Sequence, residues 1–214
     1  MTFSIVARDK LTGQLGVATA TAGPAVGSLV PHAQAGVAAI ATQALTNPYL
    51  AFDFLARAAE LGAEQALSAA LDADPDRERR QAIGIDAQGH IAAWTGELCQ
   101  DHAGHMVDDG LAVAGNILSG PDVLTAMVEA GKAEAPLAER LMGALEAGAA
   151  AGGDKRGINS AALKVFGAET YPIVDVRVDW SEDPLPALLS LLERTLSGGY
   201  ADFFAQVHRR GAAG

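Results

Sequence analysis

Residues 2–21 read TFSIVARDKLTGQLGVATAT, and they narrow the kind of fold that this chain can adopt. Phe3 to Ala7 and Gln14 to Thr21 are short runs that carry the Ile, Val and Thr residues typical of strands. The residues DKLTG at 9–13, which separate these runs, have the composition of a turn. The chain is therefore predicted to open with a β-hairpin, and Thr2 directly precedes its first strand.

Beyond this hairpin, helices are expected in pairs. Asn47-Pro48 places an N-cap before a proline at the first helical position, and Gly62 separates that helix from the next. Ser119 followed by Asp122 resembles a capping box and predicts a second pair. A third pair is expected after Asp183-Pro184, with a break at Gly198-Gly199. The predicted helices of the first two pairs span 48–61, 63–73, 121–133 and a stretch that begins at Pro136.

Further strands separate these helix pairs. The segment that carries Cys99, His102 and His105 is predicted to be a loop between strands. Because strands and helices come in separate groups, the order disfavours a parallel Rossmann-type sheet. It favours the α+β type of α/β protein, in which two mostly antiparallel sheets pack together with helix pairs on their outer faces. The predicted strands span 36–43, 81–85, 90–95, 111–116, 160–166 and 173–178.

Composition limits the domain organisation and the partners. The 214 residues contain no linker, so we expect one domain over 1–214, with a core at about 2–180 and a C-terminal helical extension over 181–214. A formal charge of −11 with only four lysines argues against a nucleic-acid partner. The single cysteine, Cys99, excludes an intramolecular disulfide and any multi-cysteine zinc site. With no export leader and no apolar run of membrane-spanning length, a cytoplasmic protein without membrane contact is expected.

Thr2 is the first candidate for chemistry. A small residue after Met1 permits removal of the methionine, and this would leave a threonine with a free α-amine. Such an amine titrates near ~8 and can act as the general base for the hydroxyl of the same residue. Many proteins begin Met-Thr without any such role, but here Thr2 is anchored at the start of a predicted buried strand.

Five blocks of sequence, in matching order, resemble a prokaryotic family known as domain of unknown function 1028. They are TFSIVARD from Thr2, ATQALTN from Ala41, AGH at 103–105, GNILSG from Gly115, and AGGDKRG from Ala151 followed by SAAL at 160–163. The resemblance covers Thr2 to about Asp179. The family is similar in fold to the N-terminal nucleophile (Ntn) hydrolases, which implies a four-layer αββα sandwich and amide hydrolysis by an N-terminal threonine. Related threonine hydrolases also use an early lysine, but this chain has none between Lys10 and Lys132.

Four other residues are expected to assist Thr2. Asp154, in a glycine-rich turn, could hold and tune the amine, and Arg156 could bind a substrate carboxylate. The other reading of this turn is an exposed charged loop. Asn116, at a strand end, and Gln43 could stabilise an oxyanion. Asn116 could equally be a buried amide that satisfies a turn.

Asn47, His32 and His105 are the remaining candidates for substrate contact. Asn47 more readily caps the helix that follows it. The His102/His105 pair lacks the third and fourth ligands that a zinc site normally needs, so neither a metal nor another cofactor is expected. Hydrolysis through Cys99 is a weaker alternative, because no neighbour in the sequence would activate its thiol.

These features predict an N-terminal-threonine amidohydrolase that acts on a small amide, N-acyl or N-carbamoyl compound through an acyl-enzyme. The alternative is a non-catalytic domain of the same fold that binds a small molecule or takes part in an assembly. Apolar residues in the C-terminal helices would allow a homodimer.

Overall fold

The structure, a computed structural model, describes residues 2–100 and 102–210. Within these ranges the chain forms two antiparallel sheets. The first has the strand order β10-β9-β2-β1-β8-β7 and the second the order β3-β4-β5-β6. The strands are β1 (Thr2–Arg8), β2 (Leu15–Thr21), β3 (Pro31–Gln34), β4 (Ala38–Ala44), β5 (Arg80–Asp86), β6 (Ile91–Thr95), β7 (Gly104–Asp108), β8 (Leu111–Asn116), β9 (Ser160–Phe166) and β10 (Pro172–Val178).

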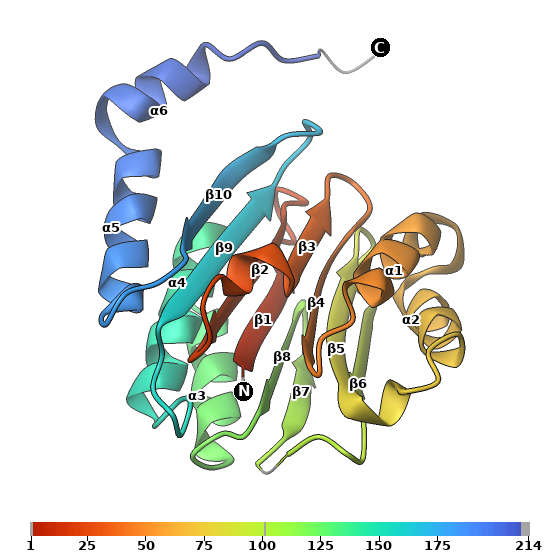
Figure 1. Ribbon diagram of the computed structural model, residues 1–214. Coiled ribbons are helices and arrows are strands. Elements are labelled where there is room, and N and C mark those ends of the chain that lie inside the picture. The colour runs from red at the N-terminus through yellow and green to blue at the C-terminus, as the bar shows by residue number, and fades with distance from the viewer. Residues whose placement is uncertain (1, 101, 211–214) are drawn as a thin grey trace.

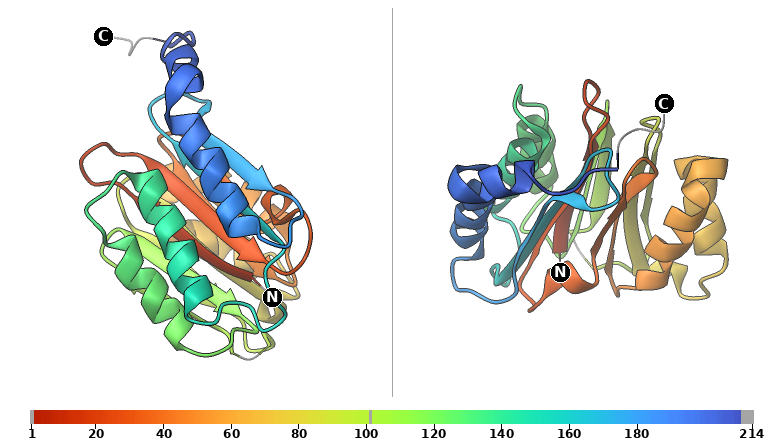
Figure 2. Two further views of the ribbon diagram at one scale, coloured as in Figure 1. Left: turned by 90° about the vertical axis from the view of Figure 1, so that its left-hand side faces the viewer. Right: turned by 90° about the horizontal axis from the view of Figure 1, so that it is seen from above.

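Helices cover the outer face of each sheet (Figures 1 and 2). The helices are α1 (Pro48–Leu61), α2 (Ala63–Asp72), α3 (Asp122–Gly131), α4 (Leu137–Ala150), α5 (Pro184–Leu196) and α6 (Gly198–Ala205), with short 3-10 turns η1 (Val26–Ser28) and η2 (Arg77–Arg79). Helices α1 and α2 pack on the four-stranded sheet. Helices α3, α4 and α5 pack on the six-stranded sheet. The result is the expected four-layer αββα sandwich.

Alternation along the strands creates three apolar layers. In β1, Phe3, Ile5 and Ala7 face helices α3 and α4, whereas Val6 faces the other sheet. The layer between the sheets is built from Val, Ile, Leu and many Ala residues. Small alanines let two sheets pack closely while their backbone hydrogen bonds stay intact.

The helix boundaries show which sequence signals were sound. Asn47 caps α1 as predicted, because its Oδ1 accepts from the Tyr49 amide at 3.1 Å, and Gly62 ends this helix at a φ of 76°. The predicted capping box at Ser119 is wrong: α3 starts at Asp122 after Pro121, without a side-chain cap. The break in the C-terminal pair lies at Ser197, and Gly198 and Gly199 open α6.

Two strands were missed. The predicted loop around His105 is in part the strand β7, and the segment Pro31–Gln34 forms β3. Both are edge strands, β7 beside β8 and β3 beside β4. None of the helices in the described ranges is both long and apolar enough to cross a membrane.

Candidate functional site

The layer between the sheets changes from apolar to polar at one end. Seven polar residues occupy the inward-facing positions that continue the apolar series of β1, β2, β4, β5 and β8, and all seven are less than 10% exposed. We call this set the polar end of the layer. It consists of Thr2, Ser4, Thr19, Thr21, Gln43, Gln81 and Asn116. Burying this many polar groups costs free energy unless each is hydrogen-bonded. We therefore take their grouping as the candidate functional site.

Thr2 is held from both sides at this end. It pairs with Thr21 of β2 and with Asn116 of β8 in the antiparallel ladders. Its hydroxyl donates to Thr21 Oγ1 at 3.2 Å, and its carbonyl accepts from Gln43 Nε2, on the opposite sheet, at 3.3 Å. The backbone and the hydroxyl of Thr2 are therefore both fixed.

Gln43 and Gln81 connect the two sheets. Gln43 Oε1 accepts from Ser4 Oγ at 2.5 Å, and Gln43 Nε2 donates to Gln81 Oε1 at 2.8 Å. The same Gln81 oxygen accepts from Asn116 Nδ2 at 3.0 Å. Gln81 Nε2 lies 2.9 Å from each of three acceptors, Thr95 Oγ1 and the carbonyls of Gly104 and Gly115. Among the described residues, no buried side-chain polar atom lacks a partner.

His105 joins this network at its edge. Its Nδ1 lies 2.9 Å from Thr95 Oγ1, which in turn contacts Gln81. Burial lowers the pKa of His105, so the neutral imidazole is favoured. His105 is thus linked to Thr2 through Thr95, Gln81 and Gln43.

Asp154 lies beside the strand end that carries Thr21. Its Oδ2 accepts from the Ala22 amide at 3.1 Å, and its Oδ1 accepts from the Arg156 amide at 2.7 Å. The Arg156 guanidinium approaches the same carboxylate at 3.5 Å. The Asp154 side chain is fully buried, whereas that of Arg156 is half exposed. The glycine-rich turn therefore directs a buried carboxylate toward the N-terminal end of β1.

Two candidates lie elsewhere. His32 is on β3, where its ring contacts Phe52 of α1 edge-on at 5.1 Å, on the outer face of the second sheet. Burial lowers its pKa. Asn47 binds Asp74 Oδ2 through its Nδ2 at 2.7 Å in addition to capping α1, so the structure places it in a structural network.

A cavity of about 460 Å³ opens next to the polar end. Gln43 is followed directly by the lining residues Ala44 and Leu45, and Asn116 both lines the cavity and is followed by Ile117. The size suits a small-molecule ligand. The cavity is lined by Ala44, Leu45, Arg79, Leu98, Cys99, Gln100, Asn116 and Ile117.

Backbone strain is concentrated in this cavity wall. Of the three non-glycine residues with positive φ in the described ranges, two are Ala44, at 68°, and Ile117, at 53°. A left-handed conformation costs an L-residue about 1–2 kcal/mol, and it is rarest for a β-branched residue such as Ile. Strain of this kind gathers at functional sites, because there the geometry serves binding or catalysis.

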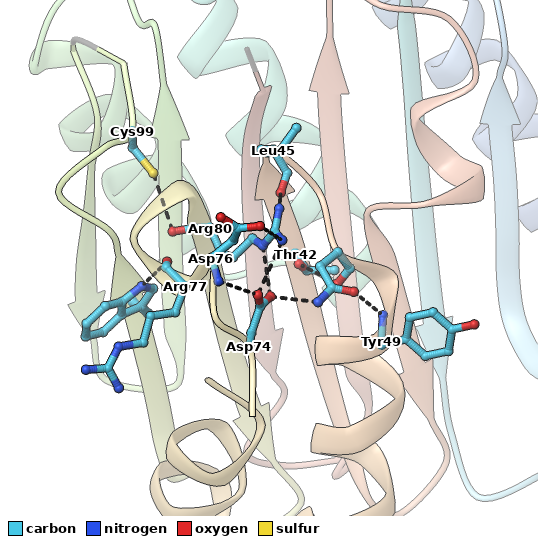
Figure 3. A network of polar contacts seen from close by, with 10 residues as sticks. Thr42, Leu45, Tyr49, Asp74, Asp76, Arg77, Arg80 and Cys99 are labelled. Carbon is cyan, nitrogen blue, oxygen red and sulfur yellow. Dashed lines mark hydrogen bonds and ion pairs between the residues drawn. The ribbon is translucent and has the colours of Figure 1, made fainter. Parts of the chain in front are cut away.

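A buried ion pair supports one wall of the cavity (Figure 3). Arg80 Nε binds Asp74 Oδ2 at 2.9 Å, and Arg80 Nη1 donates to the Leu45 carbonyl at 2.7 Å. Hydrogen bonding from Arg80 is the largest cause that lowers the pKa of Asp74. The ion pair thereby fixes the strained segment Ala44–Leu45.

Cys99 lines the cavity but is not activated. Its Sγ donates to the Arg80 carbonyl at 3.4 Å, and burial raises the pKa of the thiol. A raised pKa favours the thiol over the nucleophilic thiolate. Within the described ranges, no group of three or more His, Cys, Asp or Glu side chains is arranged to hold a metal ion.

Comparison with known proteins agrees with this architecture. The crystal structure of protein SPO2555 from Silicibacter pomeroyi, itself assigned to DUF1028, superposes with a TM-score of 0.90 at 32% identity, over 96% of this chain and 91% of that one. No curated protein matches the sequence.

Two structures of Anbu, the ancestral β-subunit, are more distant. Anbu from Yersinia bercovieri matches at 13% identity with a TM-score of 0.37, over 97% of this chain and 99% of that one. A Gly-1 mutant of Anbu from Hyphomicrobium sp. strain MC1 matches at 9% identity with a TM-score of 0.44, over 98% and 99%. At these scores, the Anbu matches support no statement about this chain.

The family model described as "Family of unknown function (DUF1028)" matches residues 2–188, which include every residue of the polar end and the whole cavity wall. Together with the 32% identical relative, this match shows the family. The chain belongs to DUF1028.

Proposed function

We propose that this protein is an N-terminal-threonine amidohydrolase that acts on a small amide, N-acyl or N-carbamoyl compound. The observation that carries the proposal is the position of Thr2. Its hydroxyl lies at the polar end of the layer between the sheets, and the residues that hold it lead directly into the cavity. A nucleophile anchored beside a cavity of this size could meet a substrate in a fixed geometry.

The reaction requires a free α-amine on Thr2, hence removal of Met1. The amine would accept the hydroxyl proton as Thr2 Oγ1 attacks the carbonyl carbon. Collapse of the tetrahedral intermediate would break the C–N bond, and the protonated amine would return its proton to the leaving nitrogen. Water would then hydrolyse the threonyl ester, release the acid and restore the hydroxyl.

The neighbouring residues support distinct roles. Asp154 would stabilise the ammonium form of the Thr2 amine from the adjacent turn. Asn116 uses one amide hydrogen on Gln81, and among the described contacts its second hydrogen is unused, so it could donate to the oxyanion in the cavity that it lines. Both amide hydrogens of Gln43 are occupied by Thr2 and Gln81. We therefore assign Gln43 as a positioning residue for Thr2.

The proposal is tested with three forms of the protein and a panel of N-acyl and N-carbamoyl amino acids. The wild type, made in its native host, is compared with Thr2→Ala and with a variant in which Ala is inserted between Met1 and Thr2. Both changes are expected to lower kcat/KM by about 10³-fold or more, because nucleophile and base are the same residue. Thr2→Ser should keep part of the activity.

Intact mass supplies an independent measurement. Active protein should lack Met1, and a chromogenic ester such as p-nitrophenyl acetate should add one acetyl group to the wild type and none to Thr2→Ala. An insertion variant with full activity, or active protein that retains Met1, would exclude this mechanism.

One observation favours a second candidate, a non-catalytic binding or assembly domain. The hydrogen bonds of the polar end are complete among the described residues, which is also what a purely structural network requires. Under this alternative, Met1 is retained in native protein and the cavity binds a small molecule without turnover.

A further inference from the structure

Arg79 differs from most arginines of this chain in its surroundings. It lines the cavity, and within the described ranges its guanidinium forms neither an ion pair nor a hydrogen bond. Its backbone, by contrast, is fixed: the amide donates to the Asp76 carbonyl at 2.8 Å, and the carbonyl accepts from the Leu45 amide at 3.2 Å. The neighbouring Arg77 and Arg80 are both paired with aspartates.

Among the described residues that line the cavity, Arg79 is the only charged one. None of these eight residues is an Asp or Glu, although the chain as a whole carries a formal charge of −11. Two acidic residues close to Arg79 in sequence, Glu78 and Asp76, are already engaged. Glu78 accepts from the Glu97 amide at 3.1 Å and pairs with Arg77, and Asp76 lies 3.7 Å from Arg80. An arginine without a partner among the described residues, in a cavity whose described lining contains no Asp or Glu, is suited to bind an anion that arrives with the ligand.

Apolar and polar groups complete the lining. Leu45 and Leu98 are more than half exposed, although both border the cavity. Gln100 and Asn116 contribute side-chain amides to the same lining, so a ligand with both an apolar part and a polar part is favoured.

We infer that Arg79 binds a carboxylate of the ligand, and that the ligand class is a small N-acyl or N-carbamoyl amino acid whose apolar side chain contacts Leu45 and Leu98. The inferred carboxylate contact rests on the cavity alone. That an amide bond of this ligand is cleaved rests on the function proposed above. Arg79 would thus determine specificity, and Arg156, held by Asp154, would not be needed for this contact.

Matched pairs of probes test this inference by binding, without turnover. N-acetyl-leucine and N-acetyl-leucinamide differ only in the charge of one end, as do the corresponding derivatives of glycine, valine and phenylalanine. Their Kd values are measured by calorimetry on full-length Thr2→Ala, in which hydrolysis cannot interfere. Failure of the threonine mechanism would therefore leave this measurement intact.

The Kd values of the acids are expected to be lower than those of the amides by about 10-fold or more, as a charge-assisted contact to arginine predicts. Arg79→Ala, and Arg79→Gln as a second variant should the first not fold, should remove this preference. Arg79→Lys should retain part of it. Arg194→Ala is the matched control, because it removes the same charge from an exposed site on α5 and should leave the preference unchanged.

Three results would overturn the inference. They are equal binding of acids and amides, a preference that survives Arg79→Ala, or no binding of any acid at millimolar concentration.

Discussion

Gln81 is the side chain that makes the polar end of the layer a single unit. It contacts Gln43 and Asn116 through its oxygen, and Thr95 and two glycine carbonyls through its nitrogen. Gln43 in turn holds the Thr2 carbonyl. The position of the proposed nucleophile therefore depends on a residue that does not touch it.

Replacing Gln81 with Leu tests this dependence. The substitution leaves the amides of Gln43 and Asn116 buried without their acceptor, and each buried group that loses its partner costs about 1–3 kcal/mol. We expect the free energy of unfolding to fall by about 2–4 kcal/mol in urea denaturation. Gln88→Leu, at an exposed turn position, should change it by less than about 0.5 kcal/mol. Equal values for the two variants would mean that the network does not stabilise the protein.

For single side chains, the sequence indicates candidate site residues where a polar residue follows a glycine or lies at the end of a strand. Such positions point to Asn116, Gln43 and Asp154. In the structure, Asn116 pairs with Thr2, Gln43 donates to the Thr2 carbonyl, and Asp154 accepts from the Ala22 amide next to Thr21. The sequence does not point to Gln81, because a glutamine at the start of a strand gives no sign of which face it occupies. Its role follows from the face-to-face packing of two sheets, and a single sequence does not encode that contact locally.

The end of β4 carries the strained Ala44, and the cavity residue Leu45 follows it. Support for this segment comes from Asp74, which lies just after α2, and from Arg80, the first residue of β5. The Asp74 side chain is 4% exposed, whereas that of Asp72, which pairs with Arg77, is 66% exposed.

Asp74→Asn and Asp72→Asn form a matched pair for this element. Removing one charge of a buried pair leaves the other uncompensated, so Asp74→Asn should lower the free energy of unfolding by about 3 kcal/mol. Asp72→Asn breaks an exposed pair and should cost less than about 1 kcal/mol. Chemical denaturation of both variants measures the difference. A similar small loss in both would show that Arg80 is held by its other contacts.

Elements with strong periodicity or clear boundary residues were predictable, whereas two of the four edge strands, β3 and β7, were not. Helix α1 has an Asn-Pro start, an apolar stripe and a terminal glycine, and the structure confirms each of them. Strands β3 and β7 are four and five residues long, and most of their residues are at least partly exposed. Because an edge strand is paired and covered on fewer sides, its sequence need not show the alternation that identifies a buried strand.

The chain as a whole carries a formal charge of −11, and its three apolar layers are tightly packed. Burial lowers the pKa of two imidazoles in different sheets, those of His32 and His105. For His32, the Lys164 charge also lowers the pKa, while its hydrogen bond to the Leu29 carbonyl raises it. Among the aspartates, Asp9 and Asp74 have lowered pKa values for a different reason, hydrogen bonds to their carboxylates.

These shifts predict how stability depends on pH. A histidine with a lowered pKa binds its proton more readily in the unfolded chain, so its contribution is present above about pH 6.5 and is lost as the pH falls. The aspartates contribute above about pH 4 and lose that contribution only in stronger acid. The histidines and the aspartates therefore both lower the stability as the pH falls. The net negative charge also decreases toward the isoelectric point, and the weaker repulsion raises the stability.

A comparison of variants separates these effects. The change in melting temperature between pH 8 and pH 5 should be less destabilising in the double variant His32→Gln/His105→Gln than in the wild type, because the two imidazoles no longer take up protons on unfolding. His208→Gln removes an exposed imidazole and should leave the wild-type profile unchanged. The double variant leaves the two aspartates in place, so its profile should rejoin the slope of the wild type below about pH 4. Parallel profiles of wild type and double variant from pH 8 to pH 5 would show that neither His32 nor His105 couples protonation to folding.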